Sequence, residues 1–281
     1  MTAHTPATIR NKYARFLIRF QPGAAKDLPL VSPHAHALAA KRLSHISYDV
    51  VLQCFSTDPF LAAKLCGVAN SIFFNLEHRQ VLTLREALDR VGVEYAQKLI
   101  LEAPPVPKGL TAKELVEYWA HCMTVSLAAG ELAAAAACLG LAPEEAALLG
   151  LIHDIGYLVE LHYNPQLLSD VLAHIRGHEP APNNLTHATL GESLSSFWSL
   201  PNDVQHALKG HHEPARASTH RGRELAALVH IADEIALSGT FGESSDRLSM
   251  ALLGLTQDAI HPISQHAARL HDELLRTSLV A

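Results

Sequence analysis

The chain has 281 residues and a net charge of −6, and 48% of its residues are apolar while 18% are charged. This composition excludes global disorder, and the acidic balance excludes the basic field that attracts a nucleic-acid backbone. The apolar stretch at residues 132–142 is too short and too rich in alanine to cross a bilayer, so we expect a globular protein without nucleic-acid or membrane partners.

The cysteines favour a reducing compartment. Cys54, Cys66, Cys122 and Cys138 each lie in an apolar helical pattern, and none of them forms a Cys-x-x-Cys pair. A free cysteine in such a pattern behaves as a small hydrophobic residue. The N-terminus also lacks an apolar run of the signal-peptide type. We therefore expect a cytoplasmic protein.

Helical periodicity recurs along the chain and strand patterns are nearly absent, which predicts an all-α fold. Asp58-Pro59 supplies an N-cap followed by proline at the first helical position, and the helix continues to about Ala69. The segment from Thr83 to Glu86 has a capping-box pattern, and Gly92 closes the short helix that follows. Three prolines within residues 103–107 cannot continue a helix, so we place a boundary between two helical lobes there.

The second half of the chain predicts a further series of helices. We expect them at about residues 111–139, 143–162, 165–178, 186–198, 202–210, 222–237 and 256–279. The chain then divides into an N-terminal extension at 1–27, an N-terminal helical lobe at 28–108, a second helical lobe at 109–237 and a C-terminal helical segment at 238–281.

A widely spaced series of metal-type ligands runs through the second lobe. Its members are Glu117, His121, His153, Asp154, His187, His211, His212 and Asp233. Together they offer enough nitrogen and oxygen donors for more than one divalent ion. Asp233 lies on an otherwise apolar helix face, which does not favour an isolated charge. The ordered set points to a metal centre more strongly than any single member does.

His153-Asp154 follows the apolar run 146–152, which would bury the start of the pair. Burying a carboxylate beside an imidazole is costly unless a cation or hydrogen-bond partners compensate, and a metal ion is the simplest compensation. A second such pair, His271-Asp272, lies on the polar side of the C-terminal helix. We interpret that second pair as a solvated surface pair.

Each remaining donor has a simpler alternative. Glu117 and His121 are four residues apart and could reach a common ion from one helix face, but such a pair is often a surface interaction. His187, in the first turn of its helix, could be a neutral residue beside the cap. The adjacent His211 and His212 could point to different ions, or to one ion and a substrate. The whole set could also form a hydrogen-bonded polar core without an ion.

The order of these ligands resembles that of the HD superfamily of metal-dependent phosphohydrolases. The resemblance is carried by His121, His153-Asp154-Ile155-Gly156, His187 with Gly191, His211-His212 and Asp233. More closely, residues 58–71 and 84–92, together with Trp198 and Leu200-Pro201, look like the HDOD family, the HD-related output domain. This resemblance covers about residues 28–237.

The resemblance implies a bacterial signalling protein whose lobe at 109–237 is an HD-like helical bundle. By similarity to the related HD-GYP phosphodiesterases, Asp154 would bridge two ions, and the remaining positions would complete the two sites. His121, His153 and Asp233 would complete one site and His187, His211 and His212 the other, while Glu117 also matches a ligand position. Nitrogen and oxygen donors without a thiolate favour one or two ions of Fe, Mn, Ni or Zn.

Two departures separate the chain from those enzymes. Tyr157 stands where they carry a lysine, and residues 213–216 lack their Gly-Tyr-Pro element. We therefore expect an HDOD-type output protein that binds metal and acts through signalling proteins, with a homo-oligomer left open. The alternative is an active phosphohydrolase or phosphodiesterase that acts on a cyclic dinucleotide or another phosphoester, with His153 and Asp154 as catalytic residues.

Overall fold

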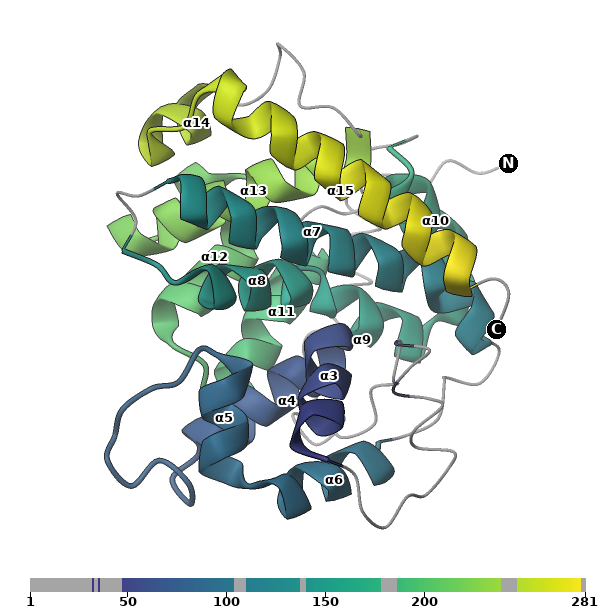
Figure 1. Cartoon of the computed structure of the whole chain (residues 1–281), viewed down its shortest axis with the longest axis vertical. Coiled ribbons are helices and arrows are strands. Elements are labelled where there is room, and N and C mark those ends of the chain that lie inside the picture. The colour runs from purple at the N-terminus through teal and green to yellow at the C-terminus, as the bar shows by residue number, and fades with distance from the viewer. Residues whose placement is uncertain are drawn as a thin grey trace, which may run out of the picture.

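The computed structural model describes Ser32, Ala35 and residues 47–103, 110–136, 140–177, 186–238 and 247–278. All regular elements in these ranges are helices, so the predicted all-α fold is confirmed (Figure 1). Of the helices described, none combines the length and the apolarity that a bilayer crossing requires. Cys54, Cys66 and Cys122 are buried, and Cys138 lies outside the described residues.

Four short helices form the described part of the first half. They are α3 (Tyr48–Thr57), α4 (Pro59–Asn70), α5 (Leu84–Val91) and α6 (Val93–Leu101). Their start signals act as predicted, because the Asp58 carboxylate accepts a hydrogen bond from the Leu61 backbone at 3.0 Å and Thr83 caps α5. Gly92 separates α5 from α6 at φ 85°, a conformation that favours glycine.

The second half of the described chain is also helical. Its elements are η2 (Ala112–Leu115), α7 (Val116–Ala135), α8 (Pro143–Ile152), α9 (Ile155–Tyr163), η3 (Pro165–Leu167), α10 (Leu168–Ile175), α11 (Thr186–Phe197), α12 (Asn202–Gly210), η4 (Pro214–Arg216), α13 (His220–Ser238), α14 (Arg247–Leu253) and α15 (Gln257–Ser278). The sequence did not predict α14.

The helix expected at residues 143–162 is interrupted, and this is the main difference from the prediction. The backbone leaves the helical region at Asp154, with φ −97° and ψ 15°, so that α8 ends and α9 begins at the His153-Asp154 pair. The break turns α9 so that Gly156 lies against the backbone of His187 in α11. Tertiary packing of α9 on α11 therefore overrides the continuous apolar pattern of this stretch.

One hydrophobic core joins the two predicted lobes. Buried apolar residues of α3–α6 belong to the same cluster as those of α7–α12. The closest approach lies at Gly67 of α4, where an added Cβ atom would be 2.6 Å from the Cβ of Trp198. The indole of Trp119 also donates a hydrogen bond to the Thr57 carbonyl at 2.6 Å. The expected boundary at 103–107 lies mostly outside the described residues.

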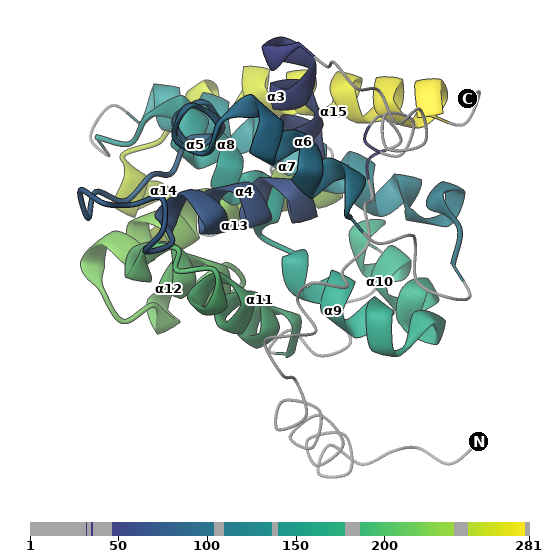
Figure 2. The same ribbon diagram turned by 90° about the horizontal axis from the view of Figure 1, so that it is seen from below.

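The C-terminal helix α15 lies along α7, on the side of the molecule opposite α3–α6 (Figures 1 and 2). A second core cluster joins α15 to α7, α13 and α14. On this interface His266 lies 2.6 Å from Glu131, and Nδ1 of His271 lies 3.2 Å from the Thr124 hydroxyl. His271 is half-buried and Asp272 is exposed, so the interpretation of this pair as solvated is wrong for the histidine.

Candidate metal centre

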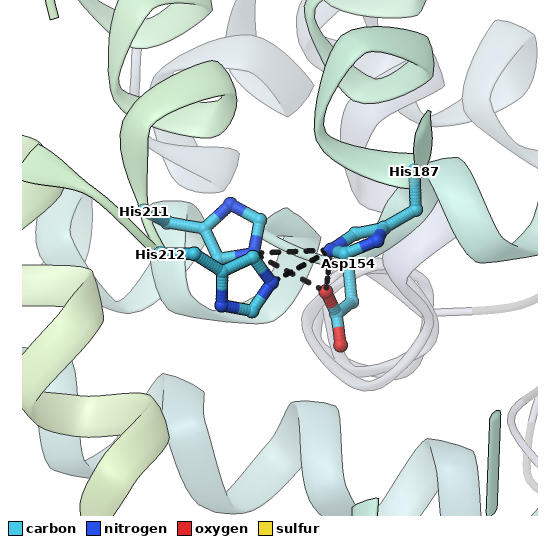
Figure 3. A group of neighbouring side chains, drawn as sticks. All are labelled: Asp154, His187, His211 and His212. Atoms are coloured by element: carbon cyan, nitrogen blue, oxygen red, sulfur yellow. Dashed lines mark hydrogen bonds and ion pairs between the residues drawn. The ribbon is translucent and has the colours of Figure 1, made fainter. Parts of the chain in front are cut away.

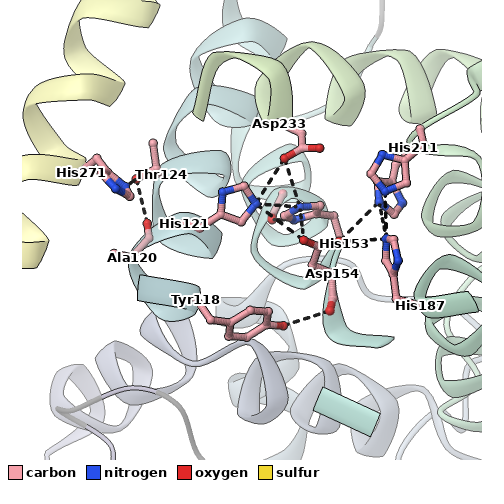
Figure 4. A network of polar contacts seen from close by, with 12 residues as sticks. Tyr118, Ala120, His121, Thr124, His153, Asp154, His187, His211, Asp233 and His271 are labelled. Carbon is pink, nitrogen blue, oxygen red and sulfur yellow. Dashed lines mark hydrogen bonds and ion pairs between the residues drawn. The ribbon is translucent and has the colours of Figure 1, made fainter. Parts of the chain in front are cut away.

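Six helices or their ends supply seven of the eight predicted donors, and these side chains are labelled around Asp154 in Figures 3 and 4. They are His121 of α7, His153 at the end of α8, Asp154 at the start of α9, His187 of α11, His211 and His212 after α12, and Asp233 of α13. Six of these donors are at most 2% exposed, whereas His212 is half-buried. His212 is therefore the most exposed of these seven donors.

The first donor group joins α7, α8 and α13 around one oxygen of Asp154 (Figure 4). The Nε2 atoms of His121 and His153 lie 3.3 Å apart. His121 Nε2 is 3.2 Å from Oδ1 of Asp233, and His153 Nε2 is 3.3 Å from Oδ2 of Asp154. Two imidazole nitrogens and one oxygen of Asp154 therefore lie close together, and Oδ1 of Asp233 adjoins both imidazoles.

The second donor group uses the other oxygen of the same carboxylate (Figure 3). Nε2 of His187 lies 3.3 Å from Nε2 of His211 and 2.9 Å from Nε2 of His212. Oδ1 of Asp154 lies 3.3 Å from His187 and 3.5 Å from His211. Asp154 thus divides its two oxygens between the two donor groups, as a bridging ligand would.

Backbone carbonyls fix the tautomers of two rings. Nδ1 of His153 lies 2.8 Å from the Gly150 carbonyl, and Nδ1 of His211 lies 2.6 Å from the Leu208 carbonyl. A carbonyl oxygen only accepts, so each Nδ1 carries a proton and the Nε2 of the neutral ring presents a lone pair. Because these lone pairs point at other imidazole nitrogens, the arrangement is suited to a shared cation. Such backbone contacts commonly orient histidine ligands.

The electrostatics of the centre also favour positive charge. Burial opposes protonation of His153, but the carboxylates of Asp154 and Asp233 more than offset this and raise its pKa to about 10. Burial opposes ionisation of both carboxyls as well, yet the surrounding imidazoles hold their pKa values well below the usual range. His187, where burial dominates, has a pKa lowered to about 4. Ionised carboxylates are the state that binds a metal, and at His153 a metal ion would displace the proton that the raised pKa retains.

The donor set therefore fits one or two divalent ions. Oδ1 of Asp154 and Oδ1 of Asp233 are buried, and neither accepts a hydrogen bond from the described residues. A buried carboxylate oxygen in that condition is costly unless a cation compensates. Five imidazoles, two carboxylates and no thiolate suit Fe, Mn, Ni or Zn better than Mg.

Glu117 lies apart from both donor groups. Its two oxygens accept hydrogen bonds from Nε and Nη2 of Arg176 in α10, each at 2.7 Å. The pair is partly exposed, and the carboxylate is neutralised by the guanidinium. The structure thus brings together His121, His153, Asp154, His187, His211, His212 and Asp233 and leaves Glu117 outside them.

Four further residues adjoin the centre. The hydroxyl of Tyr118 donates to the Asp154 carbonyl at 3.0 Å, and Tyr157 stacks on His187. His174 of α10 lies edge-on to His212. Burial and the nearby Asp154 carboxylate raise the pKa of Glu160 to about 8. The sequence signal that could have found Glu160 is a carboxyl within a mostly apolar helix, whereas His174 lies in an amphipathic helix and gives no such signal.

Comparison with known proteins gives a consistent family and fold. The model of the HDOD domain family matches residues 28–214, which is more than half of the chain. The structure is similar to that of the MmoQ response regulator from Methylococcus capsulatus str. Bath, with a TM-score of 0.63 and 21% identity over 85% of this chain and 98% of that one. It is also similar to a virulence factor from Campylobacter jejuni subsp. jejuni, with a TM-score of 0.62 and 17% identity over 89% and 98% of the two chains.

Among curated proteins, an uncharacterized protein of Treponema pallidum (strain Nichols) is 27% identical over 172 residues. The match covers 58% of this chain and 33% of that protein, so the chain spans about a third of this relative's length. At such identities the structural neighbours establish a shared fold.

Proposed function

Because this chain belongs to the HDOD domain family, we propose that it is a signal-transduction protein that binds one or two divalent ions in its second lobe and acts through protein partners. The observation that carries the metal-binding part is the position of Asp154, whose two oxygens face two separate groups of imidazole nitrogens. When bound, the ions would supply the positive charge that this buried donor set favours.

An exposed apolar loop between α4 and α5 supports action through a protein partner. Ile72, Phe73 and Leu76 are each about 80% exposed, although large apolar side chains at one site on a monomer surface are costly to hydrate. Clusters of this kind commonly mark interaction sites.

The loop is held in a defined conformation. The Asn70 side chain both accepts from and donates to the backbone of Val81, at 2.8 and 2.9 Å. The Arg90 guanidinium donates to the Asn75 side chain at 3.1 Å and to the Arg79 carbonyl at 2.8 Å. The exposed apolar side chains are therefore presented by a braced loop, which reduces the ordering cost of binding a partner.

Elemental analysis tests the metal-binding part. Protein purified without chelator should contain one or two equivalents of Fe, Mn, Ni or Zn, and Asp154→Ala should lose most of it because both groups lose an oxygen donor. Glu131→Ala, on the side of α7 that faces α15 and outside both donor groups, is the control and should keep the wild-type content. Equal metal content in wild type and Asp154→Ala would contradict the proposal.

A capture experiment tests the partner part. A specific protein recovered from lysate by the wild type should be lost with Phe73→Ser, since that side chain contributes apolar area at the centre of the loop. Leu248→Ser is the control, because Leu248 is equally exposed but lies on α14. Recovery of the same proteins by both variants would argue against the loop as the partner surface.

A metal-dependent phosphohydrolase or phosphodiesterase is the second candidate, and the bridging position of Asp154 between two donor groups favours it. In two-metal hydrolases the ions lower the pKa of a bound water toward about 7 and neutralise charge on the phosphoryl oxygens. His153 and Asp154 would then be the catalytic residues. If metal-loaded protein hydrolyses neither cyclic dinucleotides nor bis(p-nitrophenyl) phosphate, this candidate is eliminated and the first one is unaffected.

A further inference from the structure

Two aromatic side chains, Tyr157 and His174, adjoin the second donor group, and we name them, together with the half-buried donor His212, the aromatic rim. Tyr157 stacks on His187 with ring centroids 4.0 Å apart and planes inclined by 15°. His174 lies 5.8 Å from the ring of His212 and 6.3 Å from the ring of Tyr157. A molecule that reaches the second donor group past His212 therefore meets these rings.

The hydroxyl of Tyr157 marks the rim as a binding site. Tyr157 is 1% exposed, and its Oη atom is buried without a hydrogen-bond partner among the described residues. A buried phenol hydroxyl almost always has a hydrogen-bond partner, because a hydroxyl that loses its hydrogen bonds to water on burial and gains none in the protein is costly. The stacking on His187 fixes the ring, so the hydroxyl is held in one place beside a proposed metal ligand. A bound molecule with an acceptor oxygen would satisfy it.

Charge identifies the kind of molecule. Two divalent ions would bring a charge of about +4, and Asp154 and Asp233 compensate roughly half of it when the imidazoles are neutral. Glu117 contributes nothing to this balance because Arg176 neutralises it. A centre that holds two ions therefore carries excess positive charge and favours an anion. A tetrahedral oxyanion has enough oxygens to contact an ion and two side-chain donors at once.

We propose that Tyr157 and His174 form a recognition pair for a phosphate group bound at the ion of His187, His211 and His212. Tyr157 donates its hydroxyl proton to one phosphate oxygen, and the His174 imidazole donates to another. This inference rests on the metal binding proposed above. Tyr157 stands where the related phosphodiesterases carry a lysine. The recognition pair gives Tyr157 a role in ligand selection, because its neutral hydroxyl replaces a charged donor.

The test measures metal content and phosphate affinity separately. Wild type, Tyr157→Phe and His174→Phe are loaded with Mn²⁺, their metal content is measured, and inorganic phosphate is titrated into each by calorimetry. Phenylalanine keeps the stacked ring and removes only the hydroxyl, so we expect full metal content and phosphate binding weakened about tenfold or more, as for loss of a hydrogen bond to a charged acceptor. Tyr163→Phe, in the same helix but 45% exposed, should bind phosphate like the wild type.

His174→Phe keeps an aromatic ring and removes the donor, so it should weaken phosphate binding in the same direction without loss of metal. Unchanged phosphate affinity in a fully metal-loaded Tyr157→Phe protein would overturn the recognition pair and leave the metal centre intact. Acetate binding as tight as phosphate binding would overturn the preference for a tetrahedral oxyanion. Wild-type protein that takes up no Mn²⁺ would instead remove the proposed function, and this inference with it.

Discussion

Gly156, the last residue of the His-Asp-Ile-Gly motif, offers a direct test of how the fold positions the centre. A Cβ atom added there would lie 2.6 Å from the carbonyl carbon of His187 and 2.8 Å from its Cα atom, and closer still to its carbonyl oxygen. All three are backbone atoms, so no side-chain rotation can relieve the contact. In Gly156→Ala the first turn of α11 must therefore move away from α9.

The size of this movement sets the expected effect. Restoring ordinary contact distances of ~3.5 Å requires a shift of more than about 1 Å, because the carbonyl oxygen is the closest of the three atoms. Overpacking of this kind typically costs about 1–3 kcal/mol, against a gain of up to about 1 kcal/mol from replacing glycine inside a helix. A shift of about 1 Å also exceeds the ~0.2 Å tolerance of metal–ligand distances. Gly156→Ala should therefore be about 1–2 kcal/mol less stable and should lose metal from the second donor group.

Urea denaturation of metal-free protein measures the first effect, and elemental analysis of loaded protein measures the second. Gly191→Ala is the matched control, since it changes the facing helix α11. A Cβ atom at Gly191 would lie 3.8 Å from Ile155, which is an ordinary contact. That variant should be as stable as the wild type, or more so, and keep its metal. A Gly156→Ala protein with wild-type stability and metal content would refute the reasoning.

Three further outcomes follow from the centre and its surroundings. In metal-free protein, burial and the Asp154 carboxylate raise the pKa of Glu160 from 4.5 to about 8. Between pH 4.5 and pH 8 the folded state therefore binds a proton that the unfolded state has lost. The free energy of unfolding should fall as the pH rises through this range. Glu160→Gln should remove this decline, so the variant should be more stable than wild type at pH 8 but not at pH 4.5. The measurement is urea denaturation at a series of pH values, and the same pH dependence of the free energy of unfolding in both proteins would contradict this expectation. Glu117→Gln breaks a partly exposed ion pair with Arg176, so it should cost at most about 1 kcal/mol and leave metal content unchanged; loss of metal would restore Glu117 as a ligand. Removing metal with a chelator should lower the melting temperature, because an ion present at about 100 times its Kd stabilises the folded state by about 2.7 kcal/mol. An unchanged melting temperature would argue against a bound ion.

The helices could be predicted where local signals specify them. Asp58-Pro59 begins α4, Thr83 caps α5 and Gly92 ends it, and all of these act within a few residues of the chain. The break between α8 and α9 could not be predicted in this way. At the break Gly156 contacts His187, and these two residues are distant in sequence. The apolar pattern also runs through the break without a change of period.

The same limit applies to the centre. A charged residue on an apolar helix face, such as Asp233, is a signal that the sequence itself contains. Glu117 carries no such signal, because Arg176, the residue that neutralises it, lies 59 positions further along the chain. His174 was missed because a histidine in an amphipathic helix is common, and only the packing of α10 brings it beside His212.

The two features that support the proposed function are joined by one helix. Helix α11 carries His187 in its first turn and is followed directly by Trp198, which lies against Gly67 of α4. The fit at Gly67 leaves no space, since an added Cβ atom would be 2.6 Å from Trp198, so a movement of Trp198 toward α4 would displace α4. Helix α4 in turn ends at Asn70, whose side chain holds the loop that presents Phe73. We therefore expect a displacement of His187 on ion binding to reach the apolar loop through these contacts, which would connect the metal centre to a partner without requiring hydrolysis.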